Sequence, residues 1–465
     1  GFAQELPHKQ KRRFHSLERP LYAMLKSVSR RQSLHMPGGQ GHAPFERIDP
    51  YLLDTTELAA TDDLYCPTGA IARAQALIAS SAGAAFTLML TGGSTAGVHT
   101  MLLYAARRGD EVILPRNAHL SCLQLCAIAG LVPVFAQPSY TKAGLPYTRL
   151  ESYVSAMDEH PHAKAVLAVR PDYYGMLNDL HALATAVHAH GMLMLCDEAH
   201  GAALNWDEAA SNAMRLGADM AVQSAHKTLP ALGSGAWLHA NERVEQERLL
   251  RTLRMVQTSS PSFVILLALD DARAWMDAQG ARACAELRGE LVHFHEKASA
   301  LGYANAQDEQ GMAYDPLRLV LYAPQGGERL SEALACIGVD VELCDERRIV
   351  CILSLMDGAE RLRKLLSALE TVKADNKVTV TEPMPAPIPP RDMPLCEAAF
   401  APCERVPLQR AVNRISAVQV GRYPPGIAWL TAGERVTPEL VQLMLQTEAS
   451  HLFGLNGDGS LNCIG

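Results

Sequence analysis

Two short apolar segments end in charged side chains, and this pair constrains the fold more than any other feature of the sequence. The segment 192–196 runs directly into Asp197, and the segment 220–222 leads to Lys227. Because an unpaired ammonium is costly to bury, a lysine at the end of a buried strand is expected to have a use. Pyridoxal phosphate needs such a pair, since a carboxylate keeps its pyridinium nitrogen charged and a lysine forms its Schiff base. Either residue alone is more often an ordinary surface group.

The region from residue 56 to about residue 255 alternates short apolar runs, glycine-marked turns and amphipathic helices. Strands are expected at 85–90, 111–114, 132–135 and 165–169, and helices at 94–108, 120–129 and 180–190. Continuous apolar strands separated by helices are typical of a mostly parallel sheet covered on both faces. In such sheets ligands bind at the carboxyl ends of the strands, where Asp197 and Lys227 are expected to lie.

At 465 residues the chain is too long for one ordinary core, so several domains are expected. The pattern of apolar and polar residues changes along the chain and indicates where these domains begin and end. We predict an N-terminal arm (1–45), a large cofactor-binding domain (46–261), a small α/β lobe (262–378), a proline-rich linker (379–393) and a small C-terminal domain (394–465). The lobe begins with a long helix over 264–286 or beyond.

Composition excludes several classes of function. Hydrophobic residues make up 48% and charged residues 20% of the chain, as in a soluble globular protein, and the net charge of −8 gives no basic field for nucleic acid. No uninterrupted apolar run reaches the roughly 18 residues of a membrane span. The eleven cysteines are scattered, and Cys122 and Cys126 have no zinc-type partners. We therefore expect no metal, no membrane and a reducing, cytoplasmic setting.

Two further segments complete a cofactor site. Residues 91–97 (Thr-Gly-Gly-Ser-Thr-Ala-Gly) follow a strand and open a helix, so Gly93, Ser94 and Thr95 are placed to hold a phosphate at a helix N-terminus. His119 begins the next helix, where an imidazole can lie flat on a pyridine ring. Ala199 shares a strand face with Asp197 and leaves room for that ring. Taken singly, the first segment also fits a tight turn with Ser94 as N-cap, and His119 fits a capping residue.

With these residues in place, the chain resembles the bacterial ornithine/lysine/arginine decarboxylase family in its short form, a family of fold-type I pyridoxal-phosphate enzymes. The matching segments cover nearly the whole chain and keep the family's order. They are residues 54–58, 62–69, 91–97, 115–119, 172–175, 197–200, 224–232, 257–262, 422–427 and 433–435. The resemblance implies a three-layer α/β sandwich with a small α/β lobe and a small C-terminal domain.

The resemblance also assigns roles to individual residues. It implies that Lys227 forms the internal aldimine, that Asp197 pairs with the ring nitrogen and that His119 stacks on the ring. The remaining cofactor residues are Gly93, Ser94, Thr95, Ala199, His200, Ser224, His226 and Ser259. His226 and Lys227 are the candidates for returning a proton. The loop 258–261 is expected to reach the cofactor of a neighbouring subunit, which implies a homodimer with shared sites and leaves larger assemblies open.

The expected activity is decarboxylation of arginine, lysine or ornithine to its amine and carbon dioxide, as a step toward polyamines. Glu434 is the first candidate for the cationic end of the substrate, with Asp172 and Tyr423 beside it. An aminotransferase is the alternative, because its substrate carboxylate usually meets an arginine of the small lobe. Four arginines are available there, namely Arg318, Arg347, Arg348 and Arg361.

The chain also departs from the family pattern near the expected pocket. Gly39 and Gln40 stand where the family has His-Lys, Asp172 stands where it has Thr, and Gly233 and Ser234 stand where it has Thr-Gln. These departures bear on the substrate and leave the cofactor residues untouched. They also motivate a third hypothesis, a weakly active paralogue that binds the cofactor.

Overall fold

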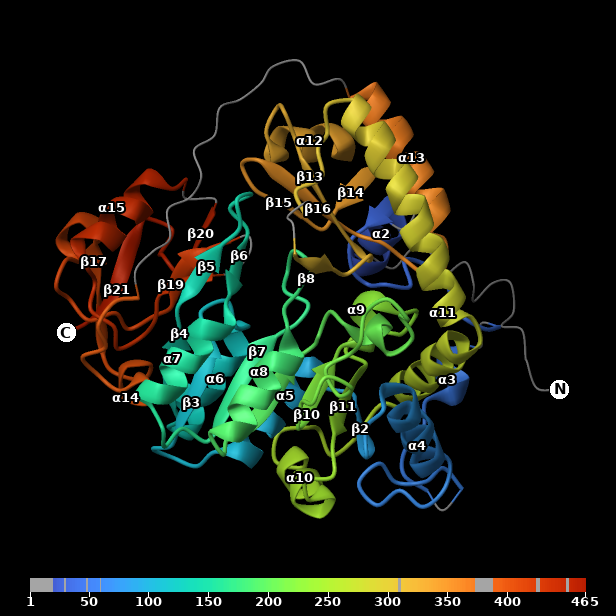
Figure 1. The fold of residues 1–465 in the computed structure, drawn as a ribbon, viewed down its shortest axis with the longest axis horizontal. Coiled ribbons are helices and arrows are strands. Elements are labelled where there is room, and N and C mark those ends of the chain that lie inside the picture. The colour runs from blue at the N-terminus through green and yellow to red at the C-terminus, as the bar shows by residue number, and fades with distance from the viewer. Residues whose placement is uncertain are drawn as a thin grey trace.

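The computed structural model divides the chain into a large domain, a small lobe and a C-terminal domain (Figure 1). It describes residues 20–28, 31–46, 49–58, 60–307, 311–372, 388–423, 427–448 and 451–465. The C-terminal domain lies on the opposite side of the molecule from the long helix α11, which joins the other two bodies (Figure 1). Most of the expected linker, 379–393, lies outside the described residues.

The large domain is built on a seven-stranded sheet in the order β2-β11-β10-β9-β7-β3-β4. Strand β11 is antiparallel to both of its neighbours, and the other neighbouring pairs run parallel. The parallel strands therefore all end at one edge of the sheet. The strands are β2 Phe86–Leu90, β3 Glu111–Pro115, β4 Val132–Ala136, β7 Ala165–Val169, β9 Leu193–Asp197, β10 Met220–Gln223 and β11 Ala236–Ala240.

Helices cover both faces of this sheet. Alternate residues of β7 show the division, because Leu167 packs in the core formed with α5, α6 and α10, whereas Val166 and Ala168 pack in the core formed with α7 and α8. Both faces are thus apolar, as continuous apolar strands require. The helices of this domain are α3 Pro50–Leu53, α4 Ala70–Ala82, α5 Gly93–Ala105, α6 Leu120–Ala129, α7 Leu150–Glu159, α8 Leu180–Ala189, α9 Ala225–Thr228 and α10 Gln246–Leu253.

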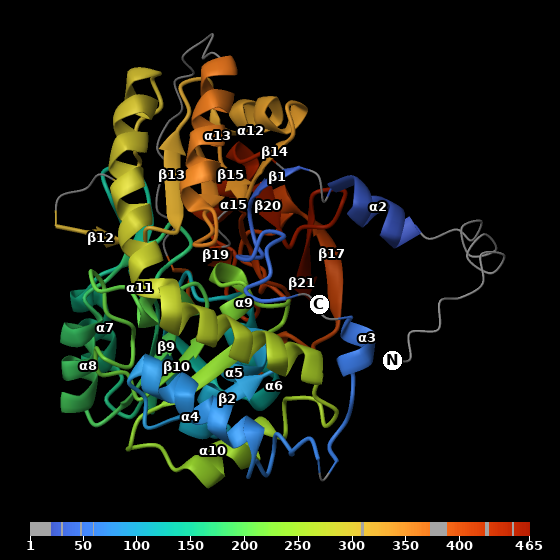
Figure 2. The ribbon, with the colours of Figure 1, turned by 90° about the vertical axis from the view of Figure 1, so that its right-hand side faces the viewer.

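The small lobe packs an antiparallel sheet, β13-β16-β15, against helices. Its first helix, α11, runs from contacts with α4 and β2 in the large domain to contacts with α13 in the lobe (Figure 2). Strand β1 of the N-terminal arm pairs in parallel with β14, so this part of the arm belongs to the lobe. The elements are β1 Gln32–Leu34, α11 Phe263–Ala300, β13 Arg318–Tyr322, α12 Gly327–Cys336, β14 Val339–Val341, β15 Leu343–Cys344, β16 Arg348–Ile352 and α13 Gly358–Thr371.

The C-terminal domain has its own small core, and it contacts the large domain through apolar residues, among them Leu395 and Ala398, and through a buried ion pair. Both terminal nitrogens of Arg116 donate to the Glu434 carboxylate, at 2.8 and 2.7 Å, and its Nε donates to the Ala428 carbonyl. Removing one partner of such a pair leaves a buried charge and typically costs about 3–5 kcal/mol. The elements are α14 Leu395–Ala398, β17 Cys403–Pro407, β18 Val420–Arg422, β19 Ile427–Leu430, α15 Pro438–Gln446, β20 Leu452–Phe453 and β21 Ser460–Ile464.

Each strand and helix that the apolar pattern predicts in the large domain is present. The predicted long helix extends further and spans Phe263–Ala300. The features that were not predicted include the helices α4, α7 and α10, the antiparallel strand β11 and the hairpin of β5 (Pro138–Tyr140) and β6 (Pro146–Thr148). In the part of the chain that the structure describes, no helix is long and apolar enough to cross a membrane.

The close packing of α5 on the sheet gives a test of this architecture. A Cβ added at Gly97 would lie 2.4 Å from Val222 Cγ2 and 2.9 Å from Leu90 Cδ1. We expect Gly97→Ala to lower the free energy of unfolding by about 1–3 kcal/mol, because the helix must move off the strands. Urea denaturation measures this. Gly289→Ala in α11 is the control, since its Cβ meets nothing within 4 Å, and equal losses in both variants would contradict the expectation.

Candidate active site

A cavity of about 580 Å³ lies at the carboxyl ends of the parallel strands, and its volume is in the usual range for a small-molecule site. Residues of the large domain form most of its wall, and Met36 from the arm and Gln419, Tyr423 and Phe453 from the C-terminal domain close it. The predicted site residues that line it are Gly93, Ser94, Thr95, His119, Asp172, Asp197, Ala199, His200, His226, Lys227 and Tyr423.

The N-terminus of α5 forms one end of the cavity. Gly93, Ser94 and Thr95 are its first residues, and the N-cap residue Gly92 makes no side-chain cap. The Gly93 N–H donates to the Ser234 carbonyl at 2.8 Å. The first turn of a helix presents N–H groups and a partial positive charge, so this end of the cavity suits a phosphate.

His119 acts as the N-cap of α6 and also faces the cavity. Its Nδ1 accepts the Ser121 backbone N–H at 3.2 Å and lies 2.8 Å from the Ser121 hydroxyl. The capping alternative is therefore confirmed, and it is compatible with a role in the cavity. Burial lowers the pKa of His119, which favours a neutral ring with its hydrogen on Nε2.

Asp197 and Ala199 enter the cavity from the end of β9. One carboxylate oxygen of Asp197 accepts the Ala199 N–H at 3.1 Å, so this turn orients the carboxylate. Both side chains line the cavity, in agreement with their expected common face. The cavity, the N-terminus of α5 and the Asp197 carboxylate together fit a pyridine ring that carries a phosphate.

Lys227 is the first member of a chain of three basic side chains. Its Nζ lies 3.3 Å from His200 Nε2, and His200 Nδ1 contacts a terminal nitrogen of Arg318. Because a guanidinium can only donate, His200 Nδ1 accepts, and the neutral ring carries its hydrogen on Nε2. That hydrogen points at Lys227, which is then best placed as an acceptor, namely the free amine.

Burial and the charge of Arg318 also favour the neutral state of the Lys227 amine. Desolvation lowers the pKa of Lys227, the Asp197 carboxylate opposes this effect, and Arg318 adds to it. The pKa of His200 lies well below its ordinary value, chiefly because the ring is buried and further because basic groups surround it. The amine of Lys227 is therefore more nucleophilic at neutral pH than that of an exposed lysine.

Asp172 lines the cavity but organises its own loop. Its Oδ1 accepts the backbone N–H groups of Tyr174 and Met176, both at 2.9 Å. Desolvation raises the pKa of this carboxyl to about 7, although the two N–H groups and the Arg318 charge oppose the shift. The departure from the family pattern at this position thus has a structural role.

Ser224 and Ser259 lie apart from the cavity wall. Ser224 is the N-cap residue of α9 and is fully buried, and its hydroxyl has no hydrogen-bond partner among the described residues. Ser259 is exposed on the loop after α10 and does not line the cavity of its own chain. His226 does line it, with Nδ1 held 3.0 Å from the Gly235 carbonyl.

The expectation for Glu434 is corrected by the structure. Glu434 is 1% exposed, both of its oxygens are held by Arg116, and Arg391 lies 3.3 Å away. It is not among the residues that line the cavity, so within this chain its carboxylate is used for joining domains. Tyr423, which was predicted for the same end of the substrate, does line the cavity and is 51% exposed.

Several lining residues were not singled out from the sequence. Tyr173 is the most informative, because its ring lies 5.3 Å from that of His200 and its hydroxyl donates to Glu342 at 3.1 Å. The motif that follows Asp172 contains this tyrosine and was a usable signal. Others include Met36, Asn117, Pro146, Gln419 and Phe453.

These elements define the class of protein. The N-terminus of α5, the Asp197 carboxylate, the His119 imidazole and the Lys227 amine share one cavity, so the residues fit pyridoxal phosphate as cofactor. The fold agrees, since lysine decarboxylase A from Pseudomonas aeruginosa superposes with a TM-score of 0.77 at 19% identity, over 89% of this chain and 74% of that chain. The chain has the architecture of a fold-type I pyridoxal-phosphate enzyme.

Comparison with known sequences gives the family. Residues 19–305 match the family described as Orn/Lys/Arg decarboxylase, major domain, and residues 392–453 match its C-terminal domain. The chain is 33% identical to the uncharacterized protein YaaO of Bacillus subtilis (strain 168) over 445 residues, 91% of this chain and 93% of that protein. It is 31% identical to the arginine decarboxylase of the same strain over 460 residues, 92% and 93% of the two. The chain belongs to the Orn/Lys/Arg decarboxylase family.

The raised pKa of Asp172 predicts a pH dependence of stability. The folded carboxyl keeps its proton between its ordinary pKa of 3.8 and about 7, whereas the unfolded carboxyl releases it. The Asp172 carboxyl therefore contributes fully to the free energy of unfolding below pH 3.8, and this contribution is lost as the pH rises toward about 7. In Asp172→Asn the amide oxygen still accepts both N–H groups. We expect the variant to gain stability relative to the wild type between pH 5 and pH 8 in urea unfolding, and a constant difference would contradict this assignment.

The contact between Arg318 and His200 predicts an effect on the Lys227 amine. Arg318→Gln removes a nearby cation and releases His200 Nδ1, so the pKa of Lys227 is expected to rise. The rate at which apoprotein captures pyridoxal phosphate, followed by absorbance, should then reach its half-maximum at higher pH. Arg288→Gln is the control, because Arg288 pairs with Asp207 away from the cavity. An unchanged midpoint in Arg318→Gln would disprove the coupling.

Proposed function

We propose that this protein decarboxylates arginine to the corresponding amine, with carbon dioxide as the second product. The observation that carries the proposal is the partly buried Lys227 amine, which shares one cavity with Asp197 and His119. The choice of arginine rests on the relative of the same length that is named arginine decarboxylase. Lysine and ornithine are the competing substrates.

The side chains of the cavity have different roles in the proposed reaction. Pyridoxal phosphate, when bound, supplies an electron sink for the pair of electrons left by the departing carboxylate. The Lys227 amine is the nucleophile that would hold the cofactor covalently. Asp197 would keep the ring nitrogen protonated, and the neutral His119 ring would provide a flat face. The N-terminus of α5 would hold the phosphate.

Proton return is assigned to Lys227 Nζ. His200 Nε2 lies 3.3 Å from this atom and holds it toward the reacting centre. A lysine with a lowered pKa exchanges protons near neutral pH more readily than an ordinary lysine, which suits a general acid. His226 is the second candidate, and its pKa is lowered by burial.

The outer end of the cavity is assigned to the cationic tail of the substrate. Asp172 also lines the cavity, although its carboxylate is held by its own loop, and the Tyr173 hydroxyl donates to the Glu342 carboxylate. Tyr423 and Phe453 of the C-terminal domain cover this end and limit the entry of water. Water exclusion strengthens every charge interaction in the cavity.

The aminotransferase alternative finds little support in the small lobe. None of its four candidate arginines is among the described residues that line the cavity. Arg348 pairs with Asp345 and Arg361 pairs with Asp357, while Arg318 contacts His200. No observation favours this function over decarboxylation.

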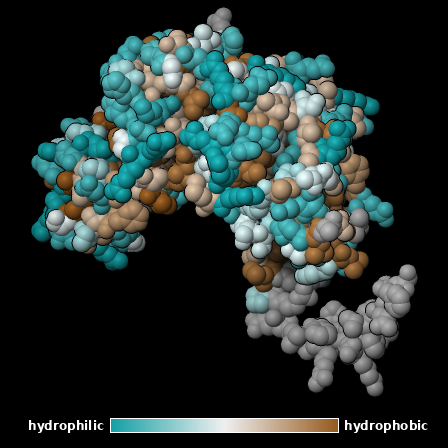
Figure 3. Space-filling model, turned by 90° about the horizontal axis from the view of Figure 1, so that it is seen from below, coloured by the Kyte–Doolittle hydropathy of each residue, from teal (hydrophilic) through white to brown (hydrophobic). Residues whose placement is uncertain are grey.

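A homodimer that shares its active sites is part of the proposal. The loop that carries Ser259 is exposed, which is compatible with a role in a partner's cavity. Seen from below, apolar side chains lie exposed among hydrophilic ones (Figure 3). Large exposed apolar side chains near the start of the described chain are Leu21 and Leu25 of α2 (Pro20–Val28) and Tyr51 and Leu52 of α3. We further propose cytoplasmic action, which supplies amines for polyamine synthesis.

Release of carbon dioxide tests the proposal directly. Purified protein loaded with pyridoxal phosphate is given arginine, lysine or ornithine, and carbon dioxide is measured. We expect release from arginine, and we expect Lys227→Ala to lose at least 1,000-fold in rate, since loss of a covalent nucleophile removes several kcal/mol of catalysis.

Exposed Lys142→Ala is the matched control and should keep its activity. Release of carbon dioxide from lysine or ornithine, but not from arginine, would show that the substrate is that amino acid and not arginine. Amino-group transfer without carbon dioxide would overturn the reaction, and a bound chromophore without turnover would favour a weakly active paralogue.

A further inference from the structure

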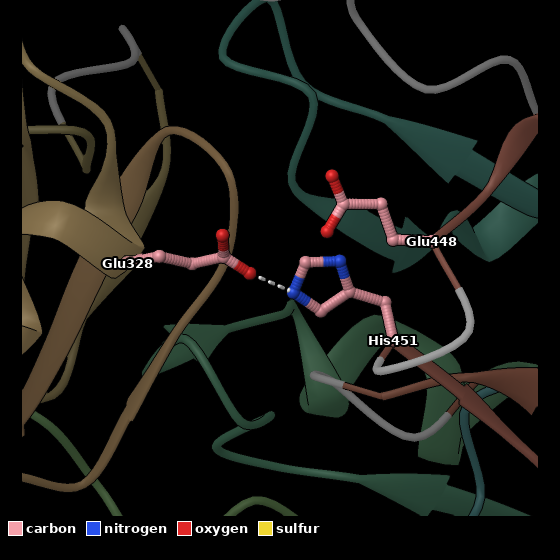
Figure 4. A group of neighbouring side chains, drawn as sticks. All are labelled: Glu328, Glu448 and His451. Carbon is pink, nitrogen blue, oxygen red and sulfur yellow. Dashed lines mark ion pairs between the residues drawn. The ribbon is translucent and has the colours of Figure 1, made fainter.

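A second cluster of ionisable side chains lies outside the cavity, at the junction of the small lobe and the C-terminal domain. Glu328 belongs to α12 of the lobe, whereas Glu448 follows α15 and His451 precedes β20 in the C-terminal domain. The three side chains point toward one another across the junction (Figure 4). One ligand atom from each lies within 4.8 Å of the others.

The backbone prearranges the C-terminal half of this cluster. The His451 N–H donates to the Glu448 carbonyl at 2.9 Å, so this hydrogen bond holds the two residues close together. The His451 carbonyl accepts the N–H of Tyr423 at 2.8 Å, and Tyr423 lines the active-site cavity. The cluster is therefore attached to the wall of that cavity.

The imidazole of His451 has one satisfied and one unsatisfied nitrogen. Nε2 contacts the Glu328 carboxylate. Nδ1 is buried and has no hydrogen-bond partner among the described residues, and the whole residue is only 5% exposed. A buried ring nitrogen without a partner is unfavourable unless something else binds it.

A third carboxylate faces this unsatisfied nitrogen at a distance that suits a metal ion. Glu346 Oε1 lies 3.6 Å from His451 Nδ1, which is too long for a hydrogen bond. Two ligands that each lie about 2.0–2.2 Å from one tetrahedral ion are separated by about 3.4 Å. The other oxygen of Glu346 is held by Arg422, which leaves Oε1 turned toward the histidine.

Charge in the cluster is also unbalanced. Glu328, Glu346 and Glu448 are three carboxylates, and Arg422 is the paired guanidinium among them. A divalent cation would offset the excess negative charge. A histidine that binds a metal through one nitrogen usually donates its other N–H to a carboxylate, and Glu328 occupies that position.

We propose that the junction binds one divalent transition-metal ion of the zinc class, through His451 Nδ1, Glu346 and Glu448. Glu328 accepts the Nε2 hydrogen and orients the ring. The imidazole nitrogen favours zinc over calcium or magnesium, which prefer oxygen ligands only. The bound ion links the small lobe to the C-terminal domain and steadies Tyr423 at the cavity wall.

Titration of the full chain with zinc tests the proposal. Chelator-treated protein is titrated with zinc chloride by calorimetry, and its melting temperature is measured with and without zinc. We expect one site per chain and a higher melting temperature with zinc, because an ion that binds the folded state stabilises it. Loss of one ligand in Glu448→Gln should weaken binding about 10–100-fold. Glu448 is exposed, so this variant should fold.

His451→Ala should abolish the site, and His293→Ala is the matched control. His293 is an exposed histidine beside Glu296 on α11 and should not affect zinc binding. Zinc binding that is absent from the wild type, or equal in the wild type and both cluster variants, would overturn the proposal. A protonated His451 that simply pairs with Glu328 and Glu346 is then the correct description. Tighter binding of calcium than of zinc would likewise overturn it.

Discussion

The contact of Lys227 with His200, and of His200 with Arg318, is the interaction on which the active site depends. Lys227 and His200 belong to the large domain, whereas Arg318 begins β13 of the small lobe. Packing of the lobe on the large domain therefore sets the hydrogen position on His200 and, through it, the state of the catalytic amine. A residue that touches neither cofactor nor substrate can thus tune the nucleophile.

A second contact between domains determines the position of the outer wall of the cavity. Arg116 leaves the end of β3, next to the active-site histidine, and reaches Glu434 and two carbonyls of the C-terminal domain. This buried pair fixes the domain that contributes Tyr423 and Phe453 to the wall. The proposed metal site joins the same domain to the small lobe. Large domain, lobe and C-terminal domain are then all tied together around one cavity.

Much of the large domain could be predicted from the sequence because its strands are continuous apolar runs and their ends carry the chemistry. Asp197 and Lys227 were found this way, and both line the cavity. Strand β11 was not predicted, since parallel order gives no reason for an antiparallel insertion. Glu434 shows a second limit of prediction from the sequence, because a carboxylate can bind a cationic substrate or pair with an arginine of the same chain. Its partner Arg116 is 318 positions away in the chain, so spacing cannot reveal the pairing.

The sequence by itself determined the fold class and the cofactor, and it singled out Asp197 and Lys227, which line the cavity, because apolar periodicity and strand-end residues are local properties of the chain. Tertiary structure alone decided which charges neutralise one another. It assigned Glu434 to Arg116, Asp172 to its own loop and Arg318 to His200. It also brought Glu328 and His451 together from separate domains. Such pairings depend on distances in space and on desolvation, and neither follows from position along the chain.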